Sequence, residues 1–158
     1  MHREFLAQQW TKLIPETCWE DAFEEARERV NTDIEVDLQG YDIDPEVIKA
    51  ARANARLAGV DGMIHFQQRA IHDFHHPKKY GFIIFNPPYG ERLLEQKEAE
   101  ELYRAFGRAV DKLPETWRVY VLSSHTEFER CFGRTADKKR KLYNGMLKCD
   151  LFMYGKRV

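Results

Sequence analysis

The chain has 158 residues, of which 43% are hydrophobic and 32% charged. This composition is typical of one folded domain and excludes a disordered chain. The formal net charge of −1 excludes binding to nucleic acid through a global basic field, so such binding requires a local basic patch. No apolar run is long enough to span a bilayer, and three scattered cysteines without a signal sequence indicate a reducing, cytoplasmic environment.

The first predicted elements are helices and one strand. Thr17 and Glu20 form a capping-box pattern, and apolar residues at helical spacing then predict a helix over residues 19–30, with a shorter helix before it. Residues 36–42 predict a strand. Asp44 and Pro45 are typical of the cap and first residue of a second helix, which ends near Gly59.

Strands and helices alternate through the rest of the chain. Residues 64–66 predict a short strand, and the continuous apolar run at 82–85 predicts a strand that is buried on both faces. A helix over 102–113, a strand over 119–122, a short helix over 128–132 and a hairpin around Asn144-Gly145 follow. This order predicts an α/β fold with a mostly parallel sheet and an antiparallel edge.

The tetrapeptide Asn86-Pro87-Pro88-Tyr89 directly follows the apolar strand at 82–85. Open α/β sheets bind their ligands at the carboxyl ends of their strands. A rigid turn would also explain a proline after an asparagine. However, a second proline followed by Gly90 exceeds what a turn requires.

The residue types of this Asn-Pro-Pro-Tyr motif suit methyl transfer to a base amine. The lone pair of such an amine is delocalised into the ring, and acceptors around its two hydrogens localise it. The side-chain oxygen of Asn86 is one acceptor, and the carbonyl of Pro87 or Pro88 is another, held by a stiff backbone. Tyr89 can stack on the base. Catalysis of this kind rests on positioning and electrostatics and needs no metal.

The longer string at residues 86–93 resembles class I S-adenosylmethionine-dependent amino-methyltransferases. It is most similar to the THUMP-containing ribosomal RNA methyltransferases, which modify the exocyclic amine of guanine in large-subunit RNA. Many of these carry the older label of adenine-specific DNA methylases. Residues 138–145 resemble that family's terminal hairpin. The resemblance implies a Rossmann-like class I methyltransferase sheet, S-adenosyl-L-methionine as cofactor and ribosomal RNA as partner.

The resemblance also implies a cofactor site. Asp42 would accept the ribose hydroxyls, and Ile43 would pack on the adenine. Asp73 would accept from the adenine amine, Phe74 would line that pocket, and Asn86 would border both cofactor and base. Asp42 as a solvated loop acid and Asp73 as a loop-start residue remain alternatives.

The chain departs from the family's pattern before Asp42. The first 39 residues contain no glycine, whereas the family has a Gly-rich loop there that brings backbone close to the cofactor. The glycines after Gly90 are isolated, so a permuted arrangement fails too, and no THUMP domain is present. We therefore expect residues 1–158 to be a single partial methyltransferase domain, truncated at its N-terminus so that the first strand and the Gly-rich loop are missing, and inactive alone. Its exposed sheet edges would favour homo-oligomers.

A local basic patch is predicted near the carboxyl end of the chain. Contacts with RNA phosphates are expected there, and Tyr143 could add stacking. The expected residues are Arg92, Lys138, Lys139, Arg140 and Lys141. A solvated sheet edge protected by lysine is the alternative.

Other functional patterns are weaker. Adjacent His75 and His76 point apart in regular structure, so no metal site is expected. Ser123 and His125 lack the elbow motif of a hydrolase. Two alternatives to guanine methylation stay open. One is methylation of an adenine amine in DNA or RNA, and the other is a noncatalytic nucleic-acid-binding fragment.

Overall fold

A computed structural model describes residues 5–31, 34–90 and 93–155 of the chain. It divides into two compact units, Met1–Asp37 and Leu38–Val158. The first unit contains the 3-10 helix η1 (Leu6–Gln9) and helix α1 (Glu16–Glu28), so both predicted helices are confirmed. Helix α1 begins directly after Pro15, which places Thr17 inside the helix rather than at its cap.

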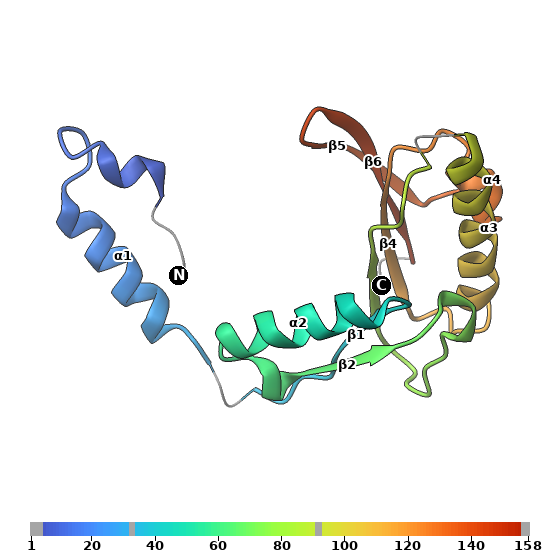
Figure 1. Ribbon diagram of the computed structural model, residues 1–158, viewed down its shortest axis with the longest axis horizontal. Helices are drawn as coiled ribbons and strands as arrows, with labels where there is room; N and C mark the ends of the chain where they lie inside the picture. The colour runs from blue at the N-terminus through green and yellow to red at the C-terminus, as the bar shows by residue number, and fades with distance from the viewer. Residues whose placement is uncertain (1–4, 32–33, 91–92, 156–158) are drawn as a thin grey trace. The chain divides into compact units, whose positions relative to one another are not determined.

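The second unit begins with a strand–helix–strand segment. Strand β1 (Leu38–Asp42) pairs in parallel with β2 (Ile64–Gln68), and α2 (Pro45–Leu57) connects them, followed by the 3-10 helix η2 (Asp61–Met63). Helix α2 runs along these two strands (Figure 1). It begins as predicted, because the Asp44 carboxylate accepts a hydrogen bond from the Glu46 amide at 2.8 Å and Pro45 is the first helical residue.

A four-stranded sheet with the order β3-β4-β6-β5 completes this unit. Strands β3 (Phe82–Phe85) and β4 (Arg118–Ser123) are parallel. Strand β6 (Leu147–Tyr154) is antiparallel to β4 and to β5 (Lys138–Asn144). The 3-10 helix η3 (Ile71–Asp73) precedes β3. The predicted α/β fold, with parallel strands and a closing antiparallel hairpin, is confirmed.

Helices α3 (Leu93–Val110) and α4 (Phe128–Phe132) both lie on one face of the four-stranded sheet (Figure 1). The core lies between these helices and the sheet and is rich in aromatic side chains, among them Tyr103, Phe106, Phe128, Phe132 and Phe152. This core fixes the position of β3 and therefore of the Asn-Pro-Pro-Tyr motif that follows it.

The other face of β3 is open, and the prediction that this strand is buried on both faces is wrong. Phe82 is 67% exposed and Ile84 is 86% exposed, whereas Ile83 and Phe85 pack on the core. Within the described residues β3 pairs with β4 alone, and α3 and α4 cover only one side. The continuous apolar run predicted the strand correctly, but it did not predict that only one face of the strand is buried.

The hairpin turn lies one residue later than predicted. Asn144 pairs with Leu147, so Gly145 and Met146 form the two-residue loop. Gly145 has φ = 62°, and glycine at the first loop position is typical of a type II′ turn. Asn144 is consequently the last residue of β5, and its side chain is available for contacts away from the turn.

Candidate active site

The Asn-Pro-Pro-Tyr motif occupies the carboxyl end of β3, beside the end of the parallel strand β4. Pro87 is buried, while Asn86 and Pro88 are exposed. Gly90 follows with φ = 69°, and a side-chain carbon there would lie 2.6 Å from the Cα of Gln96 in α3. Only glycine fits this close approach, so the loop is held tightly between the strand and the helix.

Asn86 and Tyr89 contact each other within the motif. The Tyr89 hydroxyl donates a hydrogen bond to the Asn86 Oδ1 at 2.7 Å. The side-chain amide of Asn144 at the end of β5 donates to the Tyr89 hydroxyl oxygen at 3.4 Å. Burial raises the pKa of Tyr89, which the Asn144 bond opposes and Cys149 reinforces. The hydroxyl therefore stays protonated and occupies the acceptor that was predicted to hold the base amine.

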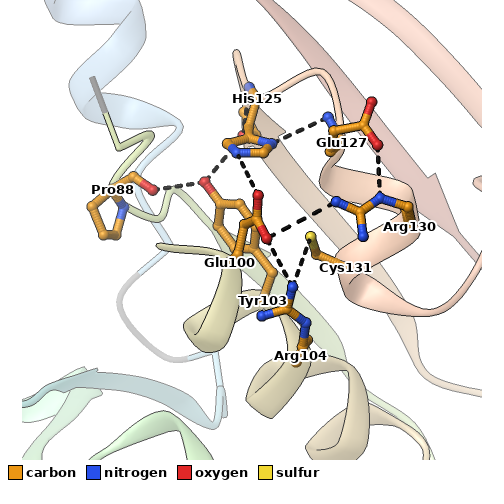
Figure 2. Close-up of polar contacts among 9 residues, drawn as sticks. Pro88, Glu100, Tyr103, Arg104, His125, Glu127, Arg130 and Cys131 are labelled. Atoms are coloured by element: carbon orange, nitrogen blue, oxygen red, sulfur yellow. Dashed lines mark hydrogen bonds and ion pairs between the residues drawn. The ribbon is translucent and has the colours of Figure 1, made fainter. Parts of the chain in front are cut away.

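A residue that the sequence did not single out fixes the next part of the loop. The hydroxyl of Tyr103, fully buried in α3, donates to the Pro88 carbonyl at 2.7 Å (Figure 2). It also lies 3.5 Å from the Ser123 Oγ. Burial also raises the pKa of Tyr103. Among the residues that the structure describes, nothing donates a hydrogen bond to the Pro87 carbonyl.

Charged side chains pack behind Tyr103. Glu100 pairs with Arg104 at 2.8 Å and lies 3.8 Å from the His125 Nε2 (Figure 2). The buried His125 ring accepts at Nδ1 from the Glu127 amide at 3.1 Å and meets the Tyr103 ring edge-on at 5.5 Å.

These contacts set the protonation state of Glu100. Burial alone would raise the pKa of Glu100, but hydrogen bonds from Arg104 and Cys131 and the charges of Arg104 and Arg130 outweigh burial and lower it. Glu100 is therefore ionised at neutral pH. Ser123 and His125 do not form a hydrolase dyad, because the Ser123 Oγ accepts from the His125 backbone amide at 3.1 Å rather than from the ring.

The predicted cofactor residue Asp42 lies at the carboxyl end of β1. Its Oδ1 accepts from the Asp44 amide at 2.9 Å, and within the described chain its second oxygen has no hydrogen-bond partner. The apolar Ile43 beside it is 69% exposed. The end of β2 holds this segment, since Gln68 donates to the Ile43 carbonyl and the Arg69 amide donates to the Asp42 carbonyl, both at 2.9 Å.

The second predicted pair, Asp73 and Phe74, lies at η3. The Phe74 ring packs edge-on against Tyr41, which directly precedes Asp42, at 5.9 Å. The exposed Asp73 carboxylate lies 3.5 Å from the His72 ring. The structure thus brings Phe74 next to the β1 end. In the described ranges no direct hydrogen bond joins Asp73 to Asp42, or either of them to Asn86.

A free carboxylate oxygen at Asp42 beside the exposed apolar Ile43 fits the adenosine part of S-adenosylmethionine, which offers ribose hydroxyls and an aromatic base.

No group of three or more metal-ligating side chains occurs in the part of the chain that the structure describes. Among the described helices, none combines the length and the apolar character that crossing a membrane requires.

The predicted basic residues lie mostly on β5. Lys138, Lys139, Arg140 and Lys141 are all exposed, and Arg92 lies outside the described residues. Lys139 also forms an ion pair, because its Nζ lies 2.7 Å from the Glu129 carboxylate of α4. That hydrogen bond raises the pKa of Lys139.

Comparison with known proteins gives a consistent family. The family described as RMKL-like, methyltransferase domain matches residues 3–152. YpsC of Bacillus subtilis (strain 168) is 40% identical over 157 residues, which are 99% of this chain and 40% of that protein. The ribosomal RNA large subunit methyltransferase K/L of Aeromonas salmonicida (strain A449) is 36% identical over 86% of this chain and 22% of its own length.

A solved structure, SMU.472 complexed with SAH (S-adenosylhomocysteine), superposes with a TM-score of 0.85 at 42% identity. The superposition covers 99% of this chain and 41% of that one. The chain thus spans between 22% and 41% of the length of these three similar proteins.

Proposed function

Because the chain belongs to the RMKL-like methyltransferase domain family, we propose that it forms the catalytic part of an S-adenosyl-L-methionine-dependent enzyme that methylates the exocyclic amine of a base. We propose guanine in large-subunit ribosomal RNA as that base. The name of the Aeromonas relative and the resemblance at residues 86–93 support this choice. A ribosomal substrate would place the protein in the cytoplasm.

One observation supports the proposal: hydrogen bonds from two tyrosines hold the Asn86 side chain and the Pro88 carbonyl in fixed positions. The side-chain oxygen of Asn86 is already oriented by a hydroxyl donor, Tyr89, at 2.7 Å. The hydrogen bond from Tyr103, at 2.7 Å, fixes the Pro88 carbonyl. Because Pro88 directly follows Pro87, this bond also restricts the orientation of the Pro87 carbonyl. Preorganised acceptors of this kind need no rearrangement when the amine develops positive charge.

The residues of this chain then act by position. When bound, S-adenosylmethionine supplies a methyl group on a positively charged sulfur. Asn86 and the Pro87 carbonyl accept the two amine hydrogens, which directs the nitrogen lone pair at the methyl carbon. The nitrogen–carbon bond forms as the sulfur–carbon bond breaks, and one amine proton passes to solvent. Tyr89, once displaced from Asn86, is free to stack on the base.

We also propose roles for the remaining predicted residues. Asp42 accepts the ribose hydroxyls, Ile43 and Phe74 contact the adenine, and Asp73 accepts from its amine. RNA phosphates are bound at β5, through basic residues of that strand.

Replacement of Asn86 tests the enzyme proposal. In the protein as its gene encodes it, Asn86→Ala should lower single-turnover methylation about a hundredfold, because one preorganised polar contact is worth about that much. S-adenosylmethionine affinity should stay the same. Asn54→Ala, on the exposed side of α2, is the matched control. Equal turnover in both variants would remove Asn86 from the reaction.

Mass spectrometry of ribosomal RNA nucleosides, from cells with and without the gene, identifies the base. Loss of N2-methylguanosine in the deletion supports guanine. Loss of N6-methyladenosine would instead establish the adenine alternative. Unchanged nucleosides, together with RNA binding by the purified protein, would favour a noncatalytic binding role.

A further inference from the structure

The basic strand β5 presents its side chains alternately to its two sides. Lys138 and Arg140 pair in register with Met153 and Leu151, on the same side as Asn144. Lys139 and Lys141 pair with Phe152 and Asp150 and point to the other side. The run of four basic residues is therefore two separate pairs.

The side that carries Lys139 faces helix α4. The Lys139 Nζ lies 2.7 Å from the Glu129 carboxylate and 5.9 Å from the centre of the Phe152 ring. Phe152 is only 4% exposed and packs on the Phe128 ring of α4 at 4.7 Å. The positive charge of Lys139 is thus compensated within the protein, and that of Lys141 lies opposite the carboxylate of Asp150 across the strand pair.

The side that carries Lys138 and Arg140 faces the Asn-Pro-Pro-Tyr motif. At the end of β5 on this side, the Asn144 amide contacts the Tyr89 hydroxyl at 3.4 Å. Cys149 pairs with Leu142 on the same side and contributes to the raised pKa of Tyr89. At about 3.3 Å per residue, Arg140 lies roughly 13 Å and Lys138 roughly 20 Å along the strand from Asn144.

We infer that substrate RNA crosses only the Lys138 and Arg140 side of the hairpin, and that Lys139 and Lys141 remain off the RNA. This inference rests on the proposed function. When a base is bound at Asn86, the RNA chain that carries it lies on the motif side of the hairpin. The phosphates that flank this base therefore contact Lys138 and Arg140. Leu142, 37% exposed on the same side, adds apolar surface between those cations and the motif.

Two double variants test the inference because they remove the same charge from opposite sides. Lys138→Gln/Arg140→Gln and Lys139→Gln/Lys141→Gln each remove two positive charges from β5. The probe is a fluorescein-labelled 20-nucleotide RNA of mixed sequence. Its dissociation constant is measured by anisotropy, at several KCl concentrations, with the protein as its gene encodes it.

We expect the Lys138/Arg140 variant to bind the RNA at least about tenfold more weakly. The slope of log K against log salt should fall by about 1.4, because each lost phosphate contact lowers it by about 0.7 for single strands. The Lys139/Lys141 variant should stay within about twofold of the wild type. Equal effects of the two double variants, including no effect of either, would overturn the inference.

Further comparisons distinguish loss of folding, and failure of the proposed function, from failure of the inference. If breaking the Lys139–Glu129 pair unfolds one double variant, Arg140→Gln and Lys141→Gln form a matched single pair with the same expected asymmetry. A wild type that neither binds RNA nor methylates it would contradict the proposed function. A wild type that does both, but is weakened equally by the two double variants, would contradict only the placement of RNA on the hairpin.

Discussion

The hydroxyl of Tyr103, on the buried side of α3, reaches the loop of the Asn-Pro-Pro-Tyr motif. We predict that Tyr103→Phe lowers single-turnover methylation about threefold to tenfold, since a lost hydrogen bond costs about 0.5–1.5 kcal/mol and the freed Pro88 carbonyl loosens the neighbouring acceptor. Cofactor affinity should not change.

Tyr154→Phe provides the matched control for this loss. Tyr154 is also a buried tyrosine, and its hydroxyl bonds to a carbonyl, that of Arg134, remote from the motif. If Tyr103 only stabilises the fold, Tyr103→Phe and Tyr154→Phe should show the same single-turnover methylation rate when they are compared at equal folded fraction.

Glu100 gives a prediction with a defined pH dependence. Its pKa in the folded protein lies below the ordinary value of 4.5 for a glutamate, so its ionised form stabilises the fold at pH values above 4.5. This stabilisation is lost as pH falls through the lowered pKa. Glu100→Gln should therefore lower the thermal unfolding midpoint at pH 7, and the difference from wild type should shrink below pH 4.5.

Glu98→Gln, exposed on the same helix, is the control for this series and should show no such trend. A difference between Glu100→Gln and wild type that stays constant from pH 7 to pH 3.5 would show that Glu100 does not depend on its arginine partners.

At the scale of single elements, local sequence signals predicted most of the structure. Asp44 and Pro45 place the start of α2 because a cap and a fixed φ act within one turn. The Asn-Pro-Pro-Tyr motif was found because it directly follows an apolar strand. The Tyr103–Pro88 bond could not be predicted. It joins residues 15 positions apart, and in the sequence Tyr103 is one more apolar-face residue of a helix.

The β5–β6 turn shows a smaller limit of local signals. Asn-Gly is compatible with several two-residue loops, and the pairing of β5 with β6 decides which residues form the loop. Here Gly145 takes the position that requires a positive φ, and Asn144 stays in the strand.

A glycine substitution tests this turn. Gly145→Ala should destabilise the protein by about 1 kcal/mol or more, because an L-residue is strained at φ = 62°. Gly62→Ala is the control, since Gly62 has open space around it and no positive φ, and it should be neutral or slightly stabilising. Urea unfolding of both variants measures the difference. Equal stability would contradict the type II′ assignment.

At the scale of the whole chain, the open side of β3 leads us to predict self-association. Among the described strands, β3 has no partner on one edge, which lies beside the exposed Phe82 and Ile84, and such edges pair readily with another copy. Ile84→Lys should lower the average mass of this 158-residue chain in light scattering at micromolar concentration.

Val47→Lys, which changes an exposed apolar residue on α2 instead, should leave that mass unchanged. A monodisperse monomer of the wild-type chain at the highest soluble concentration would refute the prediction.

The hydrogen bond between Tyr89 and Asn86 determines whether the Asn86 contact contributes to the affinity for RNA or to the rate of methyl transfer. An amine that reaches Asn86 replaces a phenol that already donates there, so the oxygen exchanges one donor for another and is never stripped of its partner. Such an exchange contributes little to the affinity for RNA, because the number of hydrogen bonds stays the same. The free energy of the contact is instead realised when the nitrogen becomes positive and outcompetes the neutral hydroxyl. If the proposed function holds, Asn86 therefore governs the rate of the bound complex, while recognition of the RNA is left to surfaces outside the loop.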